Sequence, residues 1–292
     1  MKFTGTYTAL ITPLKRGRVD EEAFINLIKE QVSAGVDGIV PTGTTGESPT
    51  LEFNEHIRVI ELAVRVAKGK IKVLAGTGAN STSEAIELTK AAQAVGADGS
   101  LLVAPYYNKP SQEGLFLHFK KIAKSTKLPI VLYSIPGRCN ISIEVETVSR
   151  LVKACNNIVG IKEAGGDADR VSQLRETLGS KFGILSGDDS LTLPFMSVGA
   201  EGVISVASNV IPRKIARMVE LYSTGKSAAA LKIHQKYYSM FKDLFLETNP
   251  VPVKYALALL GKCTEEYRLP LTKMTSDNRK QLAKTLKRCE LI

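Results

Sequence analysis

Short apolar segments alternate with longer amphipathic segments over the first 224 residues. In the longer segments, apolar residues recur every three or four positions, as in residues 24–32 and 57–64, which predicts helices with one core-facing side. Strands that alternate with helices predict parallel βαβ units. We predict eight strands, at Thr6–Ile11, Gly38–Val40, Lys72–Ala75, Ser100–Val103, Ile130–Tyr133, Ile158–Lys162, Gly183–Ser186 and Gly202–Val206.

Eight strand–helix units predict an α/β protein with a (β/α)8 barrel, the TIM-barrel fold. The alternative is an open doubly wound sheet, whose fingerprint is G-x-G-x-x-G after a strand. Residues 76–81, Gly-Thr-Gly-Ala-Asn-Ser, come nearest to this fingerprint but lack the third glycine. The pattern therefore favours the barrel.

A glycine pair that recurs where a predicted helix meets the next strand supports the barrel. In each copy the first glycine suits the left-handed position past a helix end, and the second begins the strand. The copies occupy residues 35–38, 96–99 and 199–202. The recurrence of the same short motif in three places indicates one repeated structural unit. Ser81 and Glu84 have the spacing of a capping box at the start of another helix.

The alternation of strands and helices stops after Thr224. Only helical patterns follow, in Ser227–Phe245, Val251–Leu260 and Ser276–Leu291. We therefore predict two parts, a barrel over residues 1–224 and a C-terminal helical extension over residues 225–292 that packs on it.

The composition is that of a globular protein, with 44% hydrophobic and 23% charged residues. The four cysteines have no CxxC spacing, so free thiols in a reducing cytosol are the simplest interpretation. No segment reaches the roughly 18 apolar residues of a membrane span, and residues 1–11 lack the apolar centre of a signal peptide. We expect a cytoplasmic protein with no membrane partner.

The net charge of +10 is the sign expected for a nucleic-acid-binding protein. The lysines are scattered over predicted helices, however, and no nucleic-acid-binding motif accompanies them. We interpret the charge as a solvated surface, whose positive field also attracts small anionic substrates such as keto acids. We expect no nucleic acid as a partner.

The carboxyl ends of the strands are where active sites of barrels lie, and Lys162 stands at one of them. Because side chains alternate along a strand, Gly160 and Lys162 should face the barrel axis, with Gly160 leaving room for the lysine. A desolvated lysine loses proton affinity and becomes a nucleophile toward a carbonyl group. The alternative is a strand-end lysine that extends into solvent.

Polar residues after other strands would complete such a site. Tyr133 ends the neighbouring strand, and a phenol can carry the protons that carbinolamine formation and dehydration require; alternatively, its ring only packs. Thr44 and Thr45 lie in a glycine-flanked turn whose N–H groups can hold a carboxylate, although the pattern alone is that of a tight turn. Arg138 can bind a second carboxylate through two hydrogen bonds, and taken by itself it would be a surface arginine.

The sequence gives no pattern of metal ligands. His56, His118 and His234 fall on separate helical segments without ligand spacing, so we interpret them as packed or surface histidines. Asp188 and Asp189 are adjacent, which is more typical of a helix cap than of a metal site.

Taken together, these residues resemble the dihydrodipicolinate synthase family, which belongs to the class I pyruvate-dependent aldolases together with N-acetylneuraminate lyase. The resemblance covers nearly the whole chain, and several motifs in the right order are more specific than any one of them. The motifs lie at residues 43–47 (GTTGE), 105–107 (PYY), 133–136 (YSIP), 160–164 (GIKEA), 185–189 (LSGDD) and 249–254 (NPVPVK).

The resemblance implies a reaction in which pyruvate, held as a Schiff base on Lys162, condenses with L-aspartate-4-semialdehyde, a step toward diaminopimelate and lysine. It implies that no metal or redox cofactor takes part. The implied proton relay consists of Tyr133, Thr44 and Tyr107, with Tyr107 supplied across a subunit interface. The implied assembly is a homotetramer, built as a dimer of dimers.

The resemblance also implies the residues that bind the two substrates. Thr45 matches the residue that binds the pyruvate carboxylate, and Arg138 matches the one that binds the carboxylate of the aldehyde substrate. Gly187 and Ile204 match backbone neighbours of the site. Two flanking positions depart from the family pattern, since Ser134 stands where Asn is common and Cys139 where Thr is common. They bear on rate or substrate tuning rather than on the class of reaction.

A regulatory site for lysine is also implied, with departures. The residues that match lysine-inhibited members are Ser48, His56, Asn80, Glu84 and Tyr106. Phe53 stands where such members often carry His, and Pro49 replaces a small residue. We therefore expect weak or altered inhibition by lysine.

Two other functions remain as alternatives. One is a sister pyruvate-dependent aldolase or lyase that acts on a different aldehyde, such as a sugar acid; Arg138 and the Thr44–Thr45 pair favour the synthase over it. The other is a non-catalytic barrel that acts as a binding protein, which the fold alone does not exclude. The presence of Lys162, Tyr133 and the threonine pair disfavours the second alternative.

Overall fold

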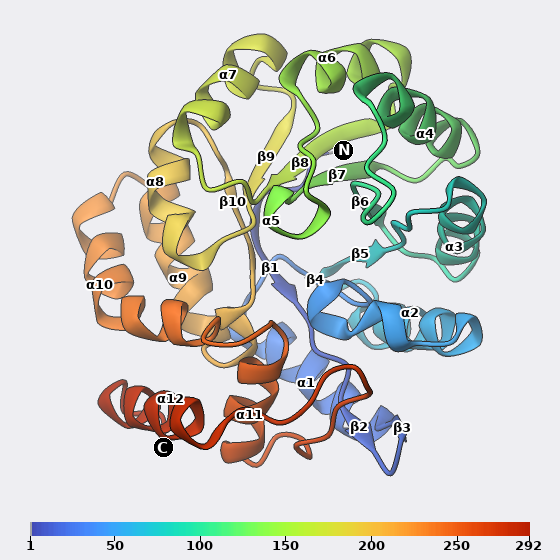
Figure 1. Cartoon of the computed structure of the whole chain (residues 1–292). Coiled ribbons are helices and arrows are strands. Elements are labelled where there is room, and N and C mark those ends of the chain that lie inside the picture. The colour runs from blue at the N-terminus through green and yellow to red at the C-terminus, as the bar shows by residue number, and fades with distance from the viewer. Residues whose placement is uncertain (1) are drawn as a thin grey trace.

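Eight parallel strands close into a barrel in the computed structural model, which describes residues 2–292 (Figure 1). Met1, the first residue of the predicted segment 1–224, lies outside the described residues. The strand order around the barrel is β1-β10-β9-β8-β7-β6-β5-β4, which confirms the predicted (β/α)8 fold. The strands are β1 (Gly5–Ala9), β4 (Gly38–Val40), β5 (Lys72–Gly76), β6 (Gly99–Val103), β7 (Ile130–Ser134), β8 (Ile158–Glu163), β9 (Gly183–Ser186) and β10 (Gly202–Ser205).

All eight predicted strands are present, with small differences at their ends. The first strand was predicted to reach Ile11 but ends at Ala9. The backbone N–H of Ile11 donates instead to the side chain of Asn209, at 3.2 Å, so the chain leaves the barrel ladder there. A hairpin of β2 (Leu14–Lys15) and β3 (Arg18–Val19) follows, which the hydrophobic pattern did not predict because two-residue strands carry no periodicity.

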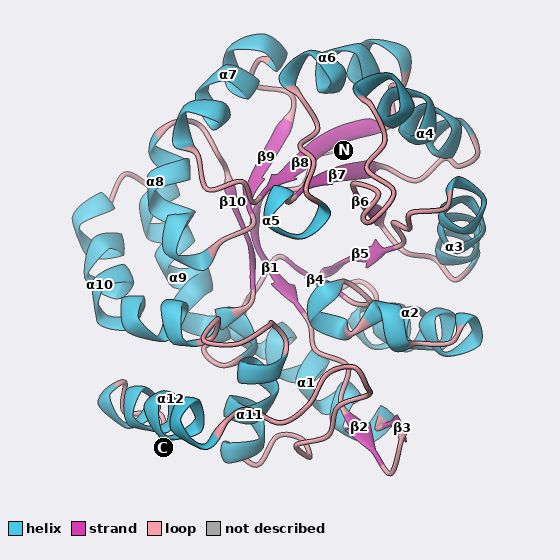
Figure 2. Ribbon diagram, in the orientation of Figure 1, coloured by secondary structure: helices cyan, strands magenta, loops and turns pink. Residues whose placement is uncertain are grey.

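Helices form an outer ring around the strands, as Figure 2 shows. They are α1 (Glu21–Ala34), α2 (Phe53–Ala67), α3 (Thr82–Ala94), α4 (Gln112–Lys124), α6 (Val145–Ala154), α7 (Ala168–Leu178), α8 (Thr192–Ser197) and α9 (Pro212–Ser223). Short turns lie at the carboxyl ends of strands: α5 (Pro136–Cys139) and the 3-10 turns η1 (Thr44–Gly46), η2 (Ser48–Thr50), η3 (Asp189–Leu191) and η4 (Ala207–Asn209).

Local signals explain where several helices begin and end. The three repeated glycines, Gly35, Gly96 and Gly199, have φ values of 77°, 89° and 108°, so their predicted left-handed conformation is confirmed. The predicted capping box at Ser81 is wrong, because its side chain makes no cap hydrogen bond and its hydroxyl contacts that of Ser83 at 2.9 Å. A capping box forms instead at the start of α2.

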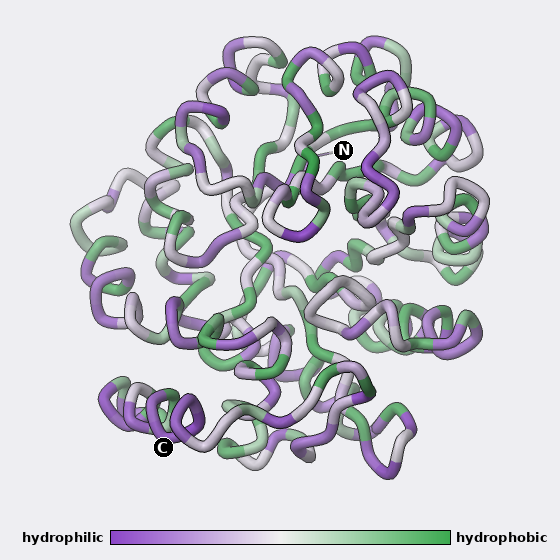
Figure 3. Tube along the Cα trace, in the orientation of Figure 1, coloured by the Kyte–Doolittle hydropathy of each residue, from purple (hydrophilic) through white to green (hydrophobic). Residues whose placement is uncertain are grey.

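The apolar residues occupy the barrel interior and the layer between the strands and the helices. Figure 3 shows this partition, with hydrophobic positions along the strands and hydrophilic positions on the outer turns of helices. Burial of this layer is the main stabilising contribution to a barrel. Within residues 2–292, no helix combines the length and apolar character that crossing a membrane requires.

The C-terminal extension consists of α10 (Ser227–Asp243), α11 (Val251–Leu259) and α12 (Ser276–Arg288), as predicted. Helix α10 packs on α9 and α12, and α11 packs on α12 and η4. Its apolar side chains join the same core as the barrel, so the division at residue 224 stays a prediction. The loop after α11 crosses to the β2–β3 hairpin, where the hydroxyl of Thr264 donates to the carbonyl of Leu14.

Candidate active site

A cavity of about 270 Å³ opens at the carboxyl ends of the barrel strands. Its lining includes Lys162, Tyr133, Thr44, Thr45 and Arg138, which come from loops and strands far apart in the sequence. Parallel strands present their carboxyl ends at one rim of the barrel, and this topology brings the five residues together. The structure therefore places these predicted residues around one space the size of a small metabolite.

Lys162 and Tyr133 lie side by side because β7 and β8 are paired in register at these two residues. Both side chains are buried, at 6% exposure each. The amine nitrogen Nζ of Lys162 lies over the Tyr133 ring, 4.1 Å from its centroid. The neighbouring strand ends thus hold an amine against a phenol inside the cavity.

Burial shifts the proton affinity of both groups. The pKa of Lys162 is lowered from 10.5 to about 7, mainly by loss of water and also by the charge of Arg138, while the charge of Asp189 opposes the shift. Burial also raises the pKa of Tyr133, so its phenol keeps its proton at neutral pH. A substantial fraction of the lysine is therefore the neutral amine, beside a protonated phenol.

The space for the lysine side chain comes from a different glycine than the sequence suggested. A Cβ atom at Gly160 would meet the carbonyl oxygen of Gly183 at 2.8 Å, so Gly160 serves the close approach of β8 to β9. A Cβ atom at Gly187 would lie 3.0 Å from Cε of Lys162 and 2.7 Å from Cβ of Ala164. Gly187, in the cavity wall, is therefore the residue whose missing side chain admits the lysine.

The turn η1 carries Thr44 and Thr45 at the cavity wall. Two hydrogen bonds close it, from Gly46 N–H to Gly43 O at 3.0 Å and from Glu47 N–H to Thr44 O at 3.1 Å. Glu47 has a left-handed φ of 56°. Because this conformation costs free energy for a residue with a Cβ atom, contacts with the rest of the protein must hold the turn in place.

Asn249, from the C-terminal extension, joins two of the predicted binding residues. Its side-chain nitrogen donates to the hydroxyl of Thr45 at 3.0 Å, and its backbone carbonyl oxygen accepts from Arg138 at 3.1 Å. Asn249 is 5% exposed and lines the cavity. This role was not predictable from the sequence, because the position of Asn249 before Pro250 marks only a turn.

Asp189, interpreted from the sequence as part of a helix cap, is a buried carboxylate beside the cavity residue Val206. It accepts hydrogen bonds from the N–H groups of Val206, at 3.0 Å, and Ala207, at 2.9 Å, and from the hydroxyl of Ser205. Burial raises its pKa to about 6 although these hydrogen bonds oppose the shift. The predicted helix cap is confirmed for the adjacent Asp188, which caps η3 through the N–H of Ser190, at 2.7 Å, but not for Asp189.

Two predicted residues lie outside the cavity wall. Tyr107 is 90% exposed and has a left-handed φ of 73°, so its side chain stands away from the cavity of its own chain. Ile204 is fully buried in β10 and does not line the cavity; Val206, two residues later, does. Of the two departures from the family pattern, Cys139 lines the cavity, whereas Ser134 is buried in β7.

The five residues of the predicted lysine site lie partly along the same cavity. Ser48 and Tyr106 line it, and Glu84 is close enough to Tyr106 to add to the rise in the tyrosine pKa that burial causes. Asn80 accepts a hydrogen bond from Asn108 through its carbonyl oxygen, at 2.9 Å. His56 is turned inward, with its Nε2 atom 2.8 Å from the carbonyl oxygen of Gly76. A lysine site therefore stays a prediction.

Side chains that bind metals do not gather in the described part of the chain. Residues 2–292 contain no group of three or more His, Cys, Asp or Glu side chains placed to hold a metal ion. The four cysteines are free thiols. His56 and His118 are buried, as a packed histidine would be.

Comparisons with known proteins agree with this geometry. The model of the dihydrodipicolinate synthetase family matches residues 2–289. The 4-hydroxy-tetrahydrodipicolinate synthase of Endomicrobium trichonymphae is 54% identical, with 98% of each chain covered. The structure of that synthase from Methylacidiphilum fumariolicum SolV has a TM-score of 0.98 and 56% identity, over 99% of this chain and 96% of the other. A dihydrodipicolinate synthase from Acinetobacter baumannii, described as complexed with pyruvate, has a TM-score of 0.96 and 43% identity, with 99% of each chain covered.

The fold and the site define a barrel enzyme of the class I aldolase type. The chain belongs to the dihydrodipicolinate synthetase family.

Proposed function

We propose that the chain is a 4-hydroxy-tetrahydrodipicolinate synthase, which condenses pyruvate with L-aspartate-4-semialdehyde on the diaminopimelate route to lysine. One observation carries the proposal: the buried amine of Lys162, with a pKa of about 7, shares a cavity with Tyr133, the Thr44–Thr45 turn and Arg138. The identity of the two substrates is inferred from the family and its named relatives.

Capture of pyruvate is the first step. The neutral amine of Lys162 attacks the ketone carbon, and the resulting carbinolamine loses water to form an iminium ion. The phenol of Tyr133 and the hydroxyl of Thr44 hand the proton to the departing oxygen. Thr45 and the N–H groups of its turn hold the carboxylate, which fixes the ketone within reach of the amine.

Condensation is the second step. Loss of a proton from the methyl carbon of the iminium ion gives an enamine, and this carbon attacks the aldehyde of the second substrate. Arg138 binds the carboxylate of that substrate and orients the aldehyde. The amino group of the product then displaces Lys162 from the imine carbon, which closes the ring and frees the enzyme.

Tyr107 completes the proton relay of a neighbouring subunit in this proposal, within a homotetramer built as a dimer of dimers. Two observations support it: the tyrosine is 90% exposed with a left-handed φ of 73°, and it does not line the cavity of its own chain, although Tyr106 before it does. An exposed aromatic side chain in a constrained conformation is suited to a protein interface.

Mixed subunits test the role of Tyr107. The variants Tyr107→Phe and Lys162→Met should each lose most activity alone. After the two are mixed, unfolded and refolded together, about a quarter of the sites should combine Lys162 of one subunit with Tyr107 of another, so activity should return. Mixtures that stay inactive, with mixed assemblies verified by mass spectrometry, would reject a role across the interface.

A turnover assay tests the proposed function. Purified protein receives pyruvate and L-aspartate-4-semialdehyde, and product formation is coupled to a reductase that consumes it. We expect saturable turnover that requires both substrates. Parallel assays with sugar-acid aldehydes distinguish the sister aldolase, because that enzyme would prefer an acceptor without the carboxylate that Arg138 binds. Turnover with sugar acids and none with aspartate semialdehyde would reject the proposal.

A further inference from the structure

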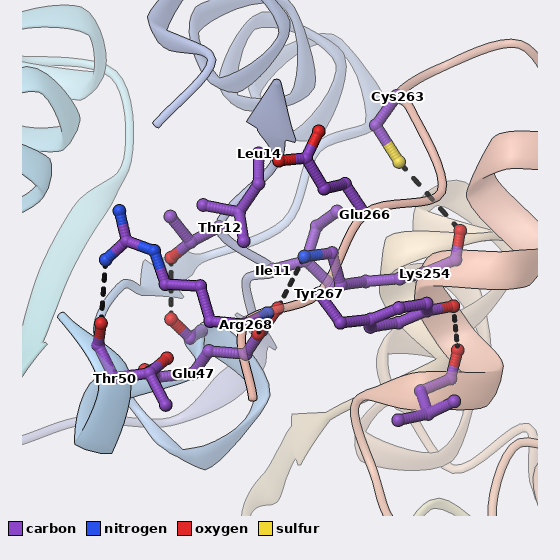
Figure 4. A network of polar contacts seen from close by, with 12 residues as sticks. Ile11, Thr12, Leu14, Glu47, Thr50, Lys254, Cys263, Glu266, Tyr267 and Arg268 are labelled. Atoms are coloured by element: carbon purple, nitrogen blue, oxygen red, sulfur yellow. Dashed lines mark hydrogen bonds and ion pairs between the residues drawn. The ribbon is translucent and has the colours of Figure 1, made fainter. Parts of the chain in front are cut away.

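Lys254 is a second buried lysine, and it lies outside the reaction described above. It belongs to α11 and is fully buried, as is its ion-pair partner Glu47, at 0% and 2% exposure (Figure 4). The second carboxylate oxygen of Glu47 accepts the backbone N–H of Arg268 at 3.3 Å. Two charges without water persist only when their partners satisfy them, so this pair is a specific feature of the fold.

The ion pair acts directly on the turn that carries the predicted substrate-binding threonines. Glu47 is the residue whose N–H closes η1 on the carbonyl of Thr44, at 3.1 Å. Its left-handed φ of 56° is a conformation that an isolated glutamate avoids. Because the side chain of Glu47 is fixed by Lys254, the backbone of the turn is fixed at the same residue.

Arg268, also in the C-terminal extension, contacts residues that follow the turn. The guanidinium group donates to the carbonyl of Thr50 at 2.7 Å and to Glu55 in α2 at 2.6 Å. Figure 4 shows Lys254 and Arg268 approaching the segment of Glu47 and Thr50 from the C-terminal extension. The segment that follows the turn, from Glu47 to Glu55, is thus tied to the extension and not only to the barrel strands.

We propose that Lys254 is a positioning residue for the reaction. Through the carboxylate of Glu47, it holds the Thr44–Thr45 turn where the hydroxyl of Thr44 reaches the reacting oxygen and the N–H groups face the pyruvate carboxylate. This inference rests on the proposed function. It gives the C-terminal extension a second link to the site, in addition to the hydrogen bonds of Asn249 with Thr45 and Arg138.

A second ion pair between the extension and the barrel provides a matched control. Lys262 lies 2.5 Å from Glu30 of α1, and both side chains are partly exposed. This pair joins the same two parts of the chain as Lys254 and Glu47 but touches neither η1 nor the cavity. Loss of the extension's docking would affect both pairs alike, whereas loss of the turn's position would follow from Lys254 alone.

The experiment compares Lys254→Met, Lys254→Arg and Lys262→Met with the full-length wild type, at a temperature where each is folded by circular dichroism. Two readouts are used: borohydride trapping of pyruvate over a range of pyruvate concentrations, and steady-state turnover. In Lys254→Met, we expect a rise of about tenfold in the pyruvate concentration for half-maximal trapping and a fall of about tenfold in kcat, because a misplaced turn weakens both binding and proton transfer. Lys254→Arg should recover part of both, and Lys262→Met should stay within about twofold of wild type.

Two results would overturn the proposal. One is a folded Lys254→Met protein with wild-type values for both readouts; the other is an equal loss in Lys262→Met. If Lys254→Met does not fold, Glu47→Gln replaces it, because it keeps the shape and acceptor oxygen of the side chain, and unchanged readouts there count equally against the proposal. If the wild type traps pyruvate but does not turn over aspartate semialdehyde, only the proposed function is rejected. The role of Lys254 can still be tested, because pyruvate trapping depends on the position of the Thr44–Thr45 turn. If the wild type traps no pyruvate, both the proposed function and the positioning role of Lys254 are rejected.

Discussion

Two lysines are buried among residues 2–292, and only one of them has a counter-ion in contact. Lys162 ends β8 at the wall of the cavity, whereas Lys254 lies in α11 against Glu47. Burial lowers the pKa of both. None of the ion pairs formed by residues 2–292 includes Lys162. Its Nζ atom instead lies over the aromatic ring of Tyr133, in a cation–π arrangement.

The difference teaches what a counter-ion does to a buried amine. A carboxylate in contact keeps the amine protonated and occupied by hydrogen bonds, so it can only hold structure. Without such a contact, the amine gives up its proton near neutral pH and becomes a nucleophile, at a cost in folding free energy. One side-chain type therefore serves reaction in one place and position in the other.

Removal of the amine of Lys162 should have the largest effect on activity. Lys162→Met should lose at least about a thousandfold in kcat/KM, because no other lysine of residues 2–292 lines the cavity. The same change should raise the thermal midpoint, since a methionine lacks the desolvation cost of the amine. Lys181→Met, on the surface, is the control for loss of a positive charge. Residual activity above a tenth of wild type would contradict the role of Lys162.

Breaking the ion pair of Lys254 should shift stability in the opposite direction. Lys254→Met should lower the free energy of unfolding by about 3–5 kcal/mol, because it leaves the charge of Glu47 buried without a partner. The double variant Lys254→Met/Glu47→Leu should recover most of this loss. Urea unfolding measures both. A single variant as stable as wild type would mean that water reaches Glu47, against its 2% exposure.

Arg138→Ala should separate the two substrates. Condensation with aspartate semialdehyde should fall by about a hundredfold in kcat/KM, because two charge-assisted hydrogen bonds are lost. Pyruvate trapping should continue, with a higher pKa for Lys162 because a neighbouring positive charge is removed. Arg138→Lys serves as the control, because it keeps the positive charge but cannot form the two parallel hydrogen bonds of a guanidinium group. Unchanged turnover in Arg138→Ala would remove Arg138 from the site.

The pH dependence of capture should report the pKa of Lys162 directly. The rate of trapping should rise about tenfold per pH unit below pH 7 and level off above it, because only the neutral amine attacks. Between about pH 7 and 10.5 the unfolded chain binds this proton and the folded chain does not, so the contribution of Lys162 to stability becomes less unfavourable as pH rises. A rate independent of pH from 6 to 8 would place the pKa elsewhere.

Much of the fold followed from the sequence, because strands and core-facing helices leave periodic patterns. The strand positions, the repeated glycines and the C-terminal helices were predicted in this way. The helix start at Ser81 was also predicted, but its capping hydrogen bonds were not correct. The hairpin at residues 14–19 was not predicted, since two-residue strands carry no periodicity.

The site was predictable where it follows from strand ends and not where it follows from long-range contacts. Lys162 and Tyr133 stand at neighbouring strand ends, so their meeting follows from parallel topology. Asn249 and Lys254 reach the turn at Thr45 and Glu47 from the other end of the chain, and no local pattern connects such residues. A lysine inside the apolar segment VPVKYALAL was the one available signal, because a buried cation requires a partner.

Borohydride reduction in the presence of pyruvate, followed by peptide mass mapping, tests the contrast between the two lysines most directly. We expect one pyruvate-derived adduct per chain, on the peptide that contains Lys162, and none on the peptide that contains Lys254. An adduct on another residue, or no adduct while the protein still turns over pyruvate, would contradict the account.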